Sequence, residues 1–186
     1  GGEGVGWWAT RVAAETRCIA LGRGALVGMD CRFSLGKPAA GELAYRQAHI
    51  PGAIHAHLDR DMSDHRKRGE GRHPWPDAAD FSETLGRWGI SPRHQVVIYD
   101  DGDGAYAARL WFLMRAAGHE KVAVLDGGWA RWTVLGLPVD ARTPIRMQTT
   151  YEAKFDSSRL LDAGQVKRRL EAGELLLDAR AADRCR

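Results

Sequence analysis

The sequence predicts an α/β domain in which a doubly wound parallel sheet carries helices on both faces. Apolar, β-branched runs alternate with helical patterns, and short glycine-bearing joints connect them. The run 95–99 is the most apolar, and helical patterns lie on both sides of it, as expected for a central strand of a parallel sheet. An acidic, glycine-rich loop, 100–104, follows it and opens a helical pattern at 105–117. A strand, loop and helix in this order are where α/β proteins place their chemistry.

The composition is that of a globular protein. The chain has 186 residues, 44% hydrophobic and 27% charged, with a formal net charge of +3, which excludes a largely disordered chain. Basic residues are scattered without interleaved aromatic residues, so we expect no nucleic-acid binding. No apolar run reaches the roughly 18 residues of a membrane span and no signal-peptide pattern is present, so we expect no membrane partner.

The cysteine content points to a reducing compartment. Cys18, Cys31 and Cys185 lie far apart and show no CxxC spacing. An odd number of unpaired cysteines predicts free thiols and a cytoplasmic location. We interpret each as an inert thiol, and we expect no metal and no cofactor.

The first predicted elements lie before residue 40. Residues 1–24 are expected to form an irregular N-terminal arm, with a short helix at 10–18. A strand is predicted over 25–29, ending at Asp30. Asp30 and Arg32 are two residues apart and point to the same side of an extended chain. We interpret them as a salt bridge that pins the strand to the next loop; the alternative is a functional polar pair.

The next region is predicted to hold a helix, a strand and a loop. The pattern at 41–48 predicts a short helix. Pro51 disfavours helix at the preceding residue and Gly52 permits a tight turn, so a second short strand follows. We expect 58–62 to continue this strand. The charged, glycine-bearing segment 63–73 is expected to be a solvated loop.

Helices and strands alternate through the rest of the domain. Asp77 is predicted to cap a helix that ends at Trp88, with Phe81, Leu85 and Trp88 on one face. Three elements follow the strand at 95–99, namely a helix at 105–117, a strand at 122–125 and a short helix with Trp129 and Trp132.

The chain divides into four predicted segments, which are the arm 1–24, the doubly wound domain 25–139, a linker 140–157 and a second unit 158–186. The second unit is predicted to hold a helix at 162–172 and a strand at 175–178. Its apolar run followed by Asp-Ala-Arg repeats the pattern of 26–32, which indicates a weak internal repeat. We therefore interpret this unit as the truncated start of a second copy, too short to bury a core alone.

Six short motifs carry a family resemblance. They are HisIleProGlyAlaIle at 49–54, GlyArgHisProTrpPro at 71–76, ValValIleTyrAsp at 96–100, AlaAlaArgLeuTrp at 107–111, LeuAspGlyGlyTrp at 125–129 and LeuAspAlaArg at 177–180. In this order the chain, from about residue 25 onward, resembles the rhodanese family. The resemblance is closest to its two-domain members, the thiosulfate and 3-mercaptopyruvate sulfurtransferases, and it implies a rhodanese-like fold.

The resemblance implies transfer of a sulfane sulfur from thiosulfate or 3-mercaptopyruvate to a thiophilic acceptor such as cyanide. In the family, a cysteine of the second domain carries the sulfur as a persulfide, and the first domain usually lacks that cysteine. Here Asp100 holds its position, and a carboxylate cannot form a persulfide. Asp101 and Asp103 add negative charge, and like charges a few ångströms apart cost roughly 1–4 kcal/mol. We therefore expect a vestigial loop and a chain that is inactive alone.

The resemblance also implies supporting residues. In the mercaptopyruvate branch the first domain lends an Asp and a His to the second-domain cysteine, and these fall on Asp59 and His73. Such a pair can fix an imidazole tautomer and move a proton. Arg184 falls where the family binds its small anionic sulfur donor, although its neighbours Asp183 and Cys185 differ from the family pattern. The implied partner is a second rhodanese-like domain; the alternative is that these are ordinary surface residues.

Two other functions stay open. A rhodanese-like fold without its cysteine can act as a non-enzymatic regulatory or docking module. Asp101-Gly102-Asp103 after a strand is also reminiscent of a Mg-dependent phosphotransferase, although no matching lysine is evident. A calcium loop would need a twelve-residue ligand spacing that the chain lacks.

Overall fold

The computed structural model describes residues 11–12, 25–156 and 158–178. The chain divides into two compact units, Gly1–Phe155 and Asp156–Arg186. The division falls inside the segment 140–157. No helix in the described part of the chain is both long and apolar enough to cross a membrane.

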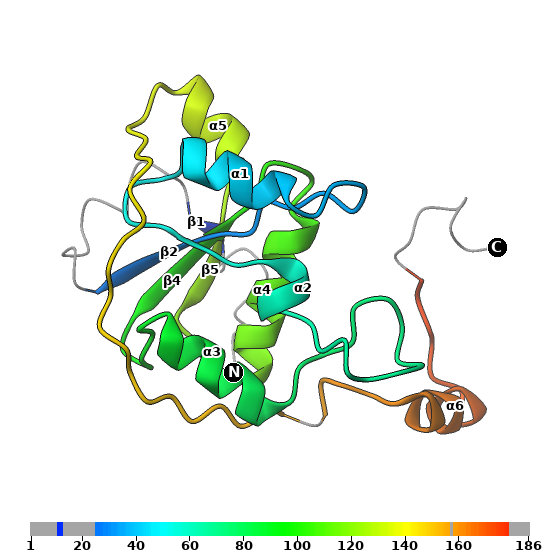
Figure 1. Cartoon of the computed structure of the whole chain (residues 1–186). Helices are drawn as coiled ribbons and strands as arrows, with labels where there is room; N and C mark the ends of the chain where they lie inside the picture. Colours follow the sequence, from blue (N-terminus) through cyan, green and yellow to red (C-terminus); the bar gives the residue numbers. More distant parts are fainter. Residues whose placement is uncertain (1–10, 13–24, 157, 179–186) are drawn as a thin grey trace, which may run out of the picture. The chain divides into compact units, whose positions relative to one another are not determined.

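The first unit is built on a five-stranded parallel sheet (Figure 1). Its strand order is β1 (Arg11–Val12), β5 (Val122–Leu125), β4 (Gln95–Tyr99), β2 (Leu26–Asp30) and β3 (Ile54–His55). Strand β4 is central, with Val97 aligned with Gly28 on one side and Ala123 on the other. The predicted parallel sheet with a central strand at 95–99 is confirmed.

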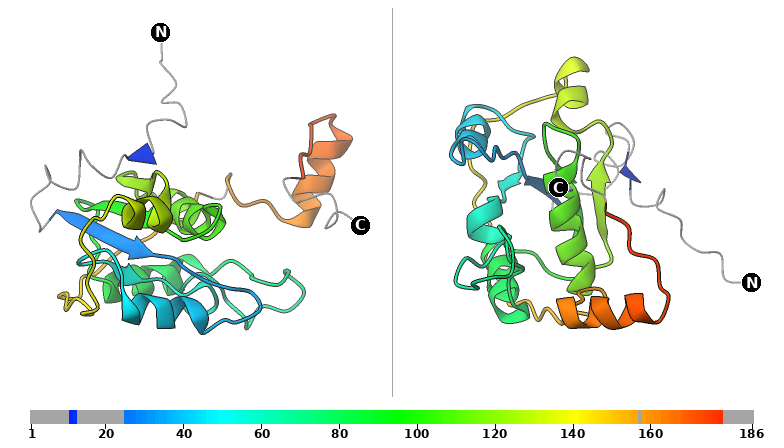
Figure 2. Two further views of the ribbon diagram at one scale, coloured as in Figure 1. Left: turned by 90° about the horizontal axis from the view of Figure 1, so that it is seen from above. Right: turned by 90° about the vertical axis from the view of Figure 1, so that its right-hand side faces the viewer.

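Helices cover both faces of the sheet, as predicted. Val96 and Ile98 of β4 pack into a core with α3 (Ala78–Arg87) and α4 (Ala105–Ala116), because alternate strand residues point to opposite faces. Val97 and Tyr99 pack on the other face with Trp132 of α5 (Gly128–Val134). Figure 1 shows α5 and α1 (Ala40–Gln47) on one side and α3 and α4 on the other, and Figure 2 gives two further views.

Two predictions for the first unit are wrong. Residues 58–62 do not continue a strand, because α2 (Leu58–Asp61) begins there. The reason is local: His57 is extended and its ring Nδ1 accepts from the backbone amides of Asp59 and Arg60, at 3.2 and 3.4 Å, which caps the helix. Within the predicted helix 10–18, Arg11–Val12 is instead a strand at the sheet edge, because the exposed edge of β5 offers backbone hydrogen-bond partners. The other residues of that prediction lie outside the described ones.

The second unit holds one of its two predicted elements. Helix α6 (Ala163–Glu171) begins with a capping box, in which Asp162 and Gln165 exchange backbone and side-chain hydrogen bonds. Residues 175–178 are not a strand. An apolar run becomes a strand only where a neighbouring strand pairs with it, and the three leucines there are between 60% and 84% exposed.

Residues 141–155 contain no helix or strand but pack closely on α3. Thr149 donates its backbone N–H to the carbonyl of Gly86 at 3.0 Å. A Cβ on Gly86 would lie 2.5 Å from the Thr149 carbonyl oxygen, so only glycine allows this approach. Ala153 donates its backbone N–H to the Ser82 hydroxyl at 2.8 Å, and the Tyr151 side chain joins the core.

A buried histidine links this segment to the sheet domain, and we expect it to make stability depend on pH. His119 Nε2 lies 3.0 Å from the His94 carbonyl, so it carries the proton, and Nδ1 accepts from the Tyr151 hydroxyl at 2.9 Å. Burial lowers the pKa of His119 below its ordinary value of 6.5. The unfolded chain therefore binds a proton more readily than the native protein as the pH falls through about 6.5, and stability falls with it.

We expect this residue to contribute a loss of at most about 1.4 kcal/mol per pH unit below that point. Urea unfolding at about pH 7.5 and about pH 5.5 measures it. His119→Gln removes the titration, so its free energy of unfolding should change less between the two pH values than that of the wild type. Equal changes in the two proteins would contradict the prediction.

Candidate functional site

In the loop after β4, residues 100–104, the backbone amides bind the side chain of the loop's own first residue, Asp100. The Asp100 carboxylate is only 3% exposed. Its Oδ1 accepts from the backbone amides of Gly102 and Gly104, at 3.0 and 3.2 Å, and its Oδ2 accepts from the amide of Ala107 at 3.0 Å. Gly104 adopts a positive φ of 90° at the start of α4, which turns these amides toward one centre. The amides that would hold an anion at this helix N-terminus thus hold the Asp100 carboxylate.

The other acids of the loop do not complete a phosphotransferase site. Asp101 and Asp103 are exposed. Asp103 Oδ1 accepts from the amide of Ala105 at 3.1 Å, a local turn contact. Among the described residues, neither belongs to a group of ligands placed to hold a metal ion. The geometry gives the phosphotransferase alternative no support.

The predicted Asp30–Arg32 salt bridge is present and fully buried. Arg32 Nε and Nη2 donate to both oxygens of the Asp30 carboxylate, at 2.7 to 3.1 Å. The Tyr99 hydroxyl donates to the same carboxylate at 2.8 Å, and Arg32 lies 4.3 Å over the Trp129 ring. Although burial raises the pKa of Asp30, the neighbouring His55 and Arg32 outweigh it and lower the pKa. This network joins β2, β4 and α5, and it holds Arg32 and the Tyr99 hydroxyl on the Asp30 carboxylate.

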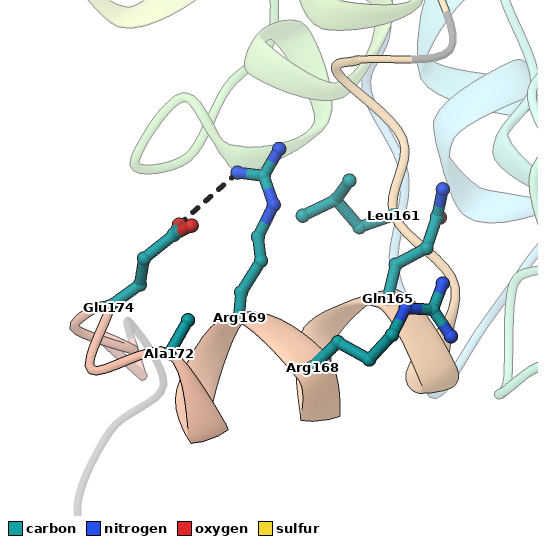
Figure 3. A pocket seen from close by; sticks show the side chains of 6 residues that line it. All are labelled: Leu161, Gln165, Arg168, Arg169, Ala172 and Glu174. Carbon is teal, nitrogen blue, oxygen red and sulfur yellow. Dashed lines mark hydrogen bonds and ion pairs between the residues drawn. The ribbon is translucent and has the colours of Figure 1, made fainter.

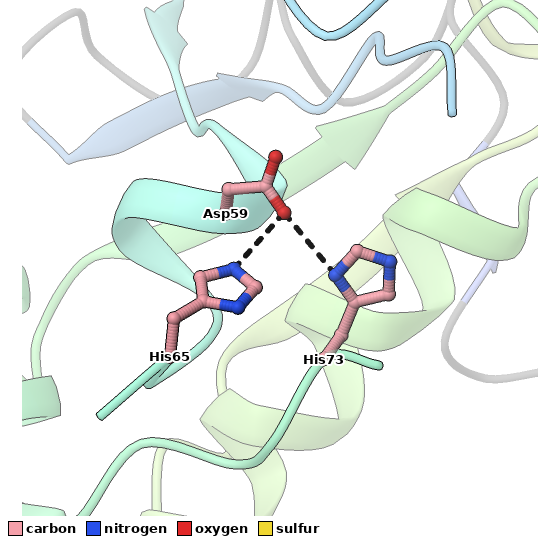
Figure 4. Close-up of side chains that lie close together, drawn as sticks. All are labelled: Asp59, His65 and His73. Atoms are coloured by element: carbon pink, nitrogen blue, oxygen red, sulfur yellow. Dashed lines mark hydrogen bonds and ion pairs between the residues drawn. The ribbon is translucent and has the colours of Figure 1, made fainter. Parts of the chain in front are cut away.

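Two residues expected at the site lie together. Asp59 stands on α2, and its Oδ1 is 3.2 Å from Nδ1 of His73 in the following loop. The same oxygen is 3.1 Å from Nε2 of His65 (Figure 4). Sequence reasoning missed His65 because it lies in the charged segment 63–73 that reads as a solvated loop. The structure thus brings an acid and two imidazoles to one point.

The two histidines differ in their bonding. His65 makes a hydrogen bond to Asp59 and is 49% exposed in its side chain. The His73 side chain is 20% exposed, and its ring nitrogens are buried with no hydrogen bond, although Nδ1 is within ion-pair distance of Asp59. Burial lowers the pKa of His73 and outweighs the attraction of Asp59. A lowered pKa favours the neutral form of the His73 imidazole.

Arg109 holds the backbone that carries His73 and was also missed. From α4 its Nη2 donates to the carbonyls of Met62 and His73, each at 2.8 Å. Its guanidinium lies 4.3 Å over the Trp75 ring. Burial lowers the pKa of Arg109 to about 10, which leaves it charged at neutral pH. The sequence placed Arg109 in a helical pattern and in the motif AlaAlaArgLeuTrp, but neither gave an indication of these targets.

The remaining candidates carry little chemistry or lie outside the described residues. Cys31 is a buried free thiol, and burial together with Asp30, Asp100 and Asp61 raises its pKa, so the interpretation as an inert thiol is supported. Cys18, Cys185 and Arg184 lie outside the described residues. A pocket on the second unit is lined by Leu161, Gln165, Arg168, Arg169, Ala172 and Glu174 (Figure 3). Its Arg169–Glu174 pair is 3.4 Å apart, and its lining includes no nucleophile or histidine.

The first unit of the chain is a parallel α/β domain with polar side chains gathered near the carboxyl ends of its strands. A family model described as a rhodanese-like domain matches residues 20–134. The chain belongs to the rhodanese family.

Several relatives that are similar in sequence are named as sulfurtransferases. A Pseudomonas aeruginosa protein, "Probable 3-mercaptopyruvate sulfurtransferase", is 40% identical over 178 residues, covering 94% of this chain and 63% of that protein. The 3-mercaptopyruvate sulfurtransferase of Mus musculus is 37% identical over 153 residues, covering 81% of this chain and 50% of that protein. Thiosulfate sulfurtransferases are also among the relatives. The chain spans less than two thirds of the length of these sequence relatives.

A solved structure gives the same architecture. SseA from Escherichia coli, described as a 3-mercaptopyruvate sulfotransferase with the rhodanese fold, superposes with a TM-score of 0.85 and 24% identity. The match covers 95% of this chain and 67% of that one. At this identity the likeness shows the fold alone, and it agrees with the predicted rhodanese-like sheet.

Proposed function

We propose that this chain supplies the domain that does not carry sulfur in a sulfurtransferase. The reaction moves a sulfane sulfur from 3-mercaptopyruvate or thiosulfate to a thiophile such as cyanide. The observation that carries the proposal is that the Asp100 carboxylate accepts hydrogen bonds from three backbone amides, in the loop after β4 and at the start of α4. It cannot become a persulfide, and it fills the place where an anionic donor would bind.

In the proposed division of labour, residues 25–139 are the non-catalytic copy and 158–186 begin a second rhodanese-like domain. That second domain is the partner, and its cysteine takes the sulfur. Asp59 lies 3.2 Å from Nδ1 of His73, and in this proposal it orients the imidazole so that the pair exchanges a proton with a thiol or substrate of the second domain. Arg184 is proposed to bind the anionic donor. The free, buried Cys31 supports a reducing, cytoplasmic location.

The direct test is sulfur transfer to cyanide by the 186-residue chain, with thiosulfate and 3-mercaptopyruvate as separate donors. We expect no turnover above the uncatalysed rate with either donor, because no described cysteine is exposed near the loop after β4. An active thiosulfate sulfurtransferase assayed in parallel shows that the method detects transfer. A variant with Cys18, Cys31 and Cys185 all replaced by serine serves as the matched control.

If the chain does show turnover, the cysteine-free variant tells which part of the proposal is wrong. Turnover that survives the triple replacement would overturn the assignment of the chemistry to a cysteine. Turnover that disappears only with one cysteine would identify a nucleophile within this chain.

A non-enzymatic regulatory or docking module is the second candidate, and the same filled loop favours it. The two functions differ at His73. In a protein that carries the second domain, His73→Gln should lower kcat if the pair supports catalysis and should leave kcat unchanged if the domain only docks.

A further inference from the structure

We propose that Asp59, His65 and His73 form a binding site for a zinc-class divalent transition-metal ion. The inference goes beyond the proposed function and does not depend on it. An ion between Asp59 and His73 would replace the contact that the proposed function uses, so the metal-bound site and the proton-exchanging pair are alternative states of the same residues. It departs from the expectation, drawn from the sequence, that the chain binds no metal. The three side chains each offer one ligand atom, and these atoms all lie within 4.8 Å of one another.

The distances suit tetrahedral zinc. Asp59 Oδ1 is 3.1 Å from His65 Nε2 and 3.2 Å from His73 Nδ1. Ligand atoms about 2.0–2.1 Å from a zinc ion lie roughly 3.3–3.4 Å apart in a regular tetrahedron. These two edges are close to the required length, and the third edge, between the two imidazole nitrogens, is at most 4.8 Å and closes by rotation of the histidine side chains. Three protein ligands also leave a fourth position open for water or a small anion.

The donor set selects the class of metal. Two imidazoles and one carboxylate suit zinc and related transition metals, whereas magnesium and calcium require mainly oxygen ligands. His73 strengthens the case, because its ring nitrogens are buried and make no hydrogen bond. A buried polar atom without a hydrogen bond costs free energy, and coordination at Nδ1 would offset part of that cost.

Cations of the described part of the protein do not pair with the carboxylate of this site, although the Arg109 guanidinium lies beside the His73 backbone. Among the described residues, no arginine or lysine forms an ion pair with Asp59. Three basic side chains near the ligands in sequence pair with other acids: Arg60 with Glu42 and Asp61, Arg66 with Asp64 and Asp80, and Lys67 with Asp77. The carboxylate of Asp59 faces the two histidines (Figure 4).

The backbone that carries the ligands is fixed by contacts that do not use the ligand side chains. The amide of Asp64 donates to the carbonyl of Pro74 at 2.9 Å and closes the loop that holds both histidines. Arg109 donates a hydrogen bond to the His73 carbonyl, and the His57 ring caps α2, the helix that carries Asp59. Such preorganisation lowers the ordering cost of binding an ion.

The test is isothermal titration of the chain with Zn²⁺, in a background where Cys18 and Cys185 are serine so that their thiolates do not bind the metal. Cobalt(II) serves as a spectroscopic probe, because its visible absorption reports tetrahedral coordination. We expect one tight equivalent of Zn²⁺, a tetrahedral cobalt spectrum and a higher Tm with zinc. His65→Gln, at an exposed position, should weaken binding by about tenfold or more, as should His73→Gln and Asp59→Asn.

Asp77→Asn is the matched control, because Asp77 belongs to a second group, Asp64, Asp77 and Asp80, that already binds Arg66 and Lys67. It should leave the titration unchanged. An isotherm and cobalt spectrum that are identical in the wild type and His65→Gln would overturn the proposal. So would a loss of zinc binding in Asp77→Asn equal to that in His65→Gln.

Discussion

Replacement of Asp30 by alanine is expected to lower the free energy of unfolding by about 3–5 kcal/mol, since it removes one partner of a buried ion pair. Asp30 is fully buried and Arg32 is 3% exposed. Without the carboxylate, the Arg32 guanidinium keeps its 2.6 Å bond to the Ala48 carbonyl but loses its counter-ion. The Tyr99 hydroxyl loses its acceptor as well. Urea unfolding followed by tryptophan fluorescence measures the effect.

The chain provides a matched control at its surface. Asp140 and Arg142 repeat the Asp-x-Arg geometry, with Arg142 Nε and Nη2 donating to the Asp140 carboxylate at 2.9 to 3.1 Å. The Arg142 side chain is 89% exposed, so water can solvate it when the acid is removed. Asp140→Ala should therefore cost far less than Asp30→Ala. Equal losses would show that burial is not the source of the effect.

The parts of the fold that were predicted correctly are those where local pattern and tertiary packing agree. The β-branched run of β4 is apolar on both faces because helices cover both faces, and this pattern can be read from the sequence. The start of α2 was missed because a histidine side chain, rather than a usual capping residue, accepts the first amides. Strand β1 depends on pairing with β5, more than 100 residues later in the chain, which no local pattern reports.

The candidate site divides in the same way. Asp59 and His73 were identified through a family resemblance, and Asp30 and Arg32 through their alternation in an extended chain. His65 and Arg109 were not, because their partners lie across a loop or 36 or more residues away along the chain. A charged loop has the same composition whether it is solvated or folded over two histidines, so its geometry had to come from the structure.

Asp100→Ala is expected to lower the free energy of unfolding by about 2–4 kcal/mol, because the amides of Gly102, Gly104 and Ala107 lose their acceptor. Ala107 is fully buried, so most of the loss should arise there. Asp103→Ala is the control. Asp103 is exposed and accepts a hydrogen bond from the amide of Ala105, so this variant should lose less free energy of unfolding than Asp100→Ala.

The same variant tests whether this loop is an anion site filled by its own residue. The cavity left by the Asp100 side chain has the size of a small carboxylate and is lined by the freed amides. Formate should therefore raise the Tm of Asp100→Ala more than chloride does at equal ionic strength. In the wild type, formate and chloride should have the same effect on the Tm. If formate and chloride act alike on the variant, the amides do not form an anion site, and the proposal that this domain carries no sulfur would lose the support of the occupied loop.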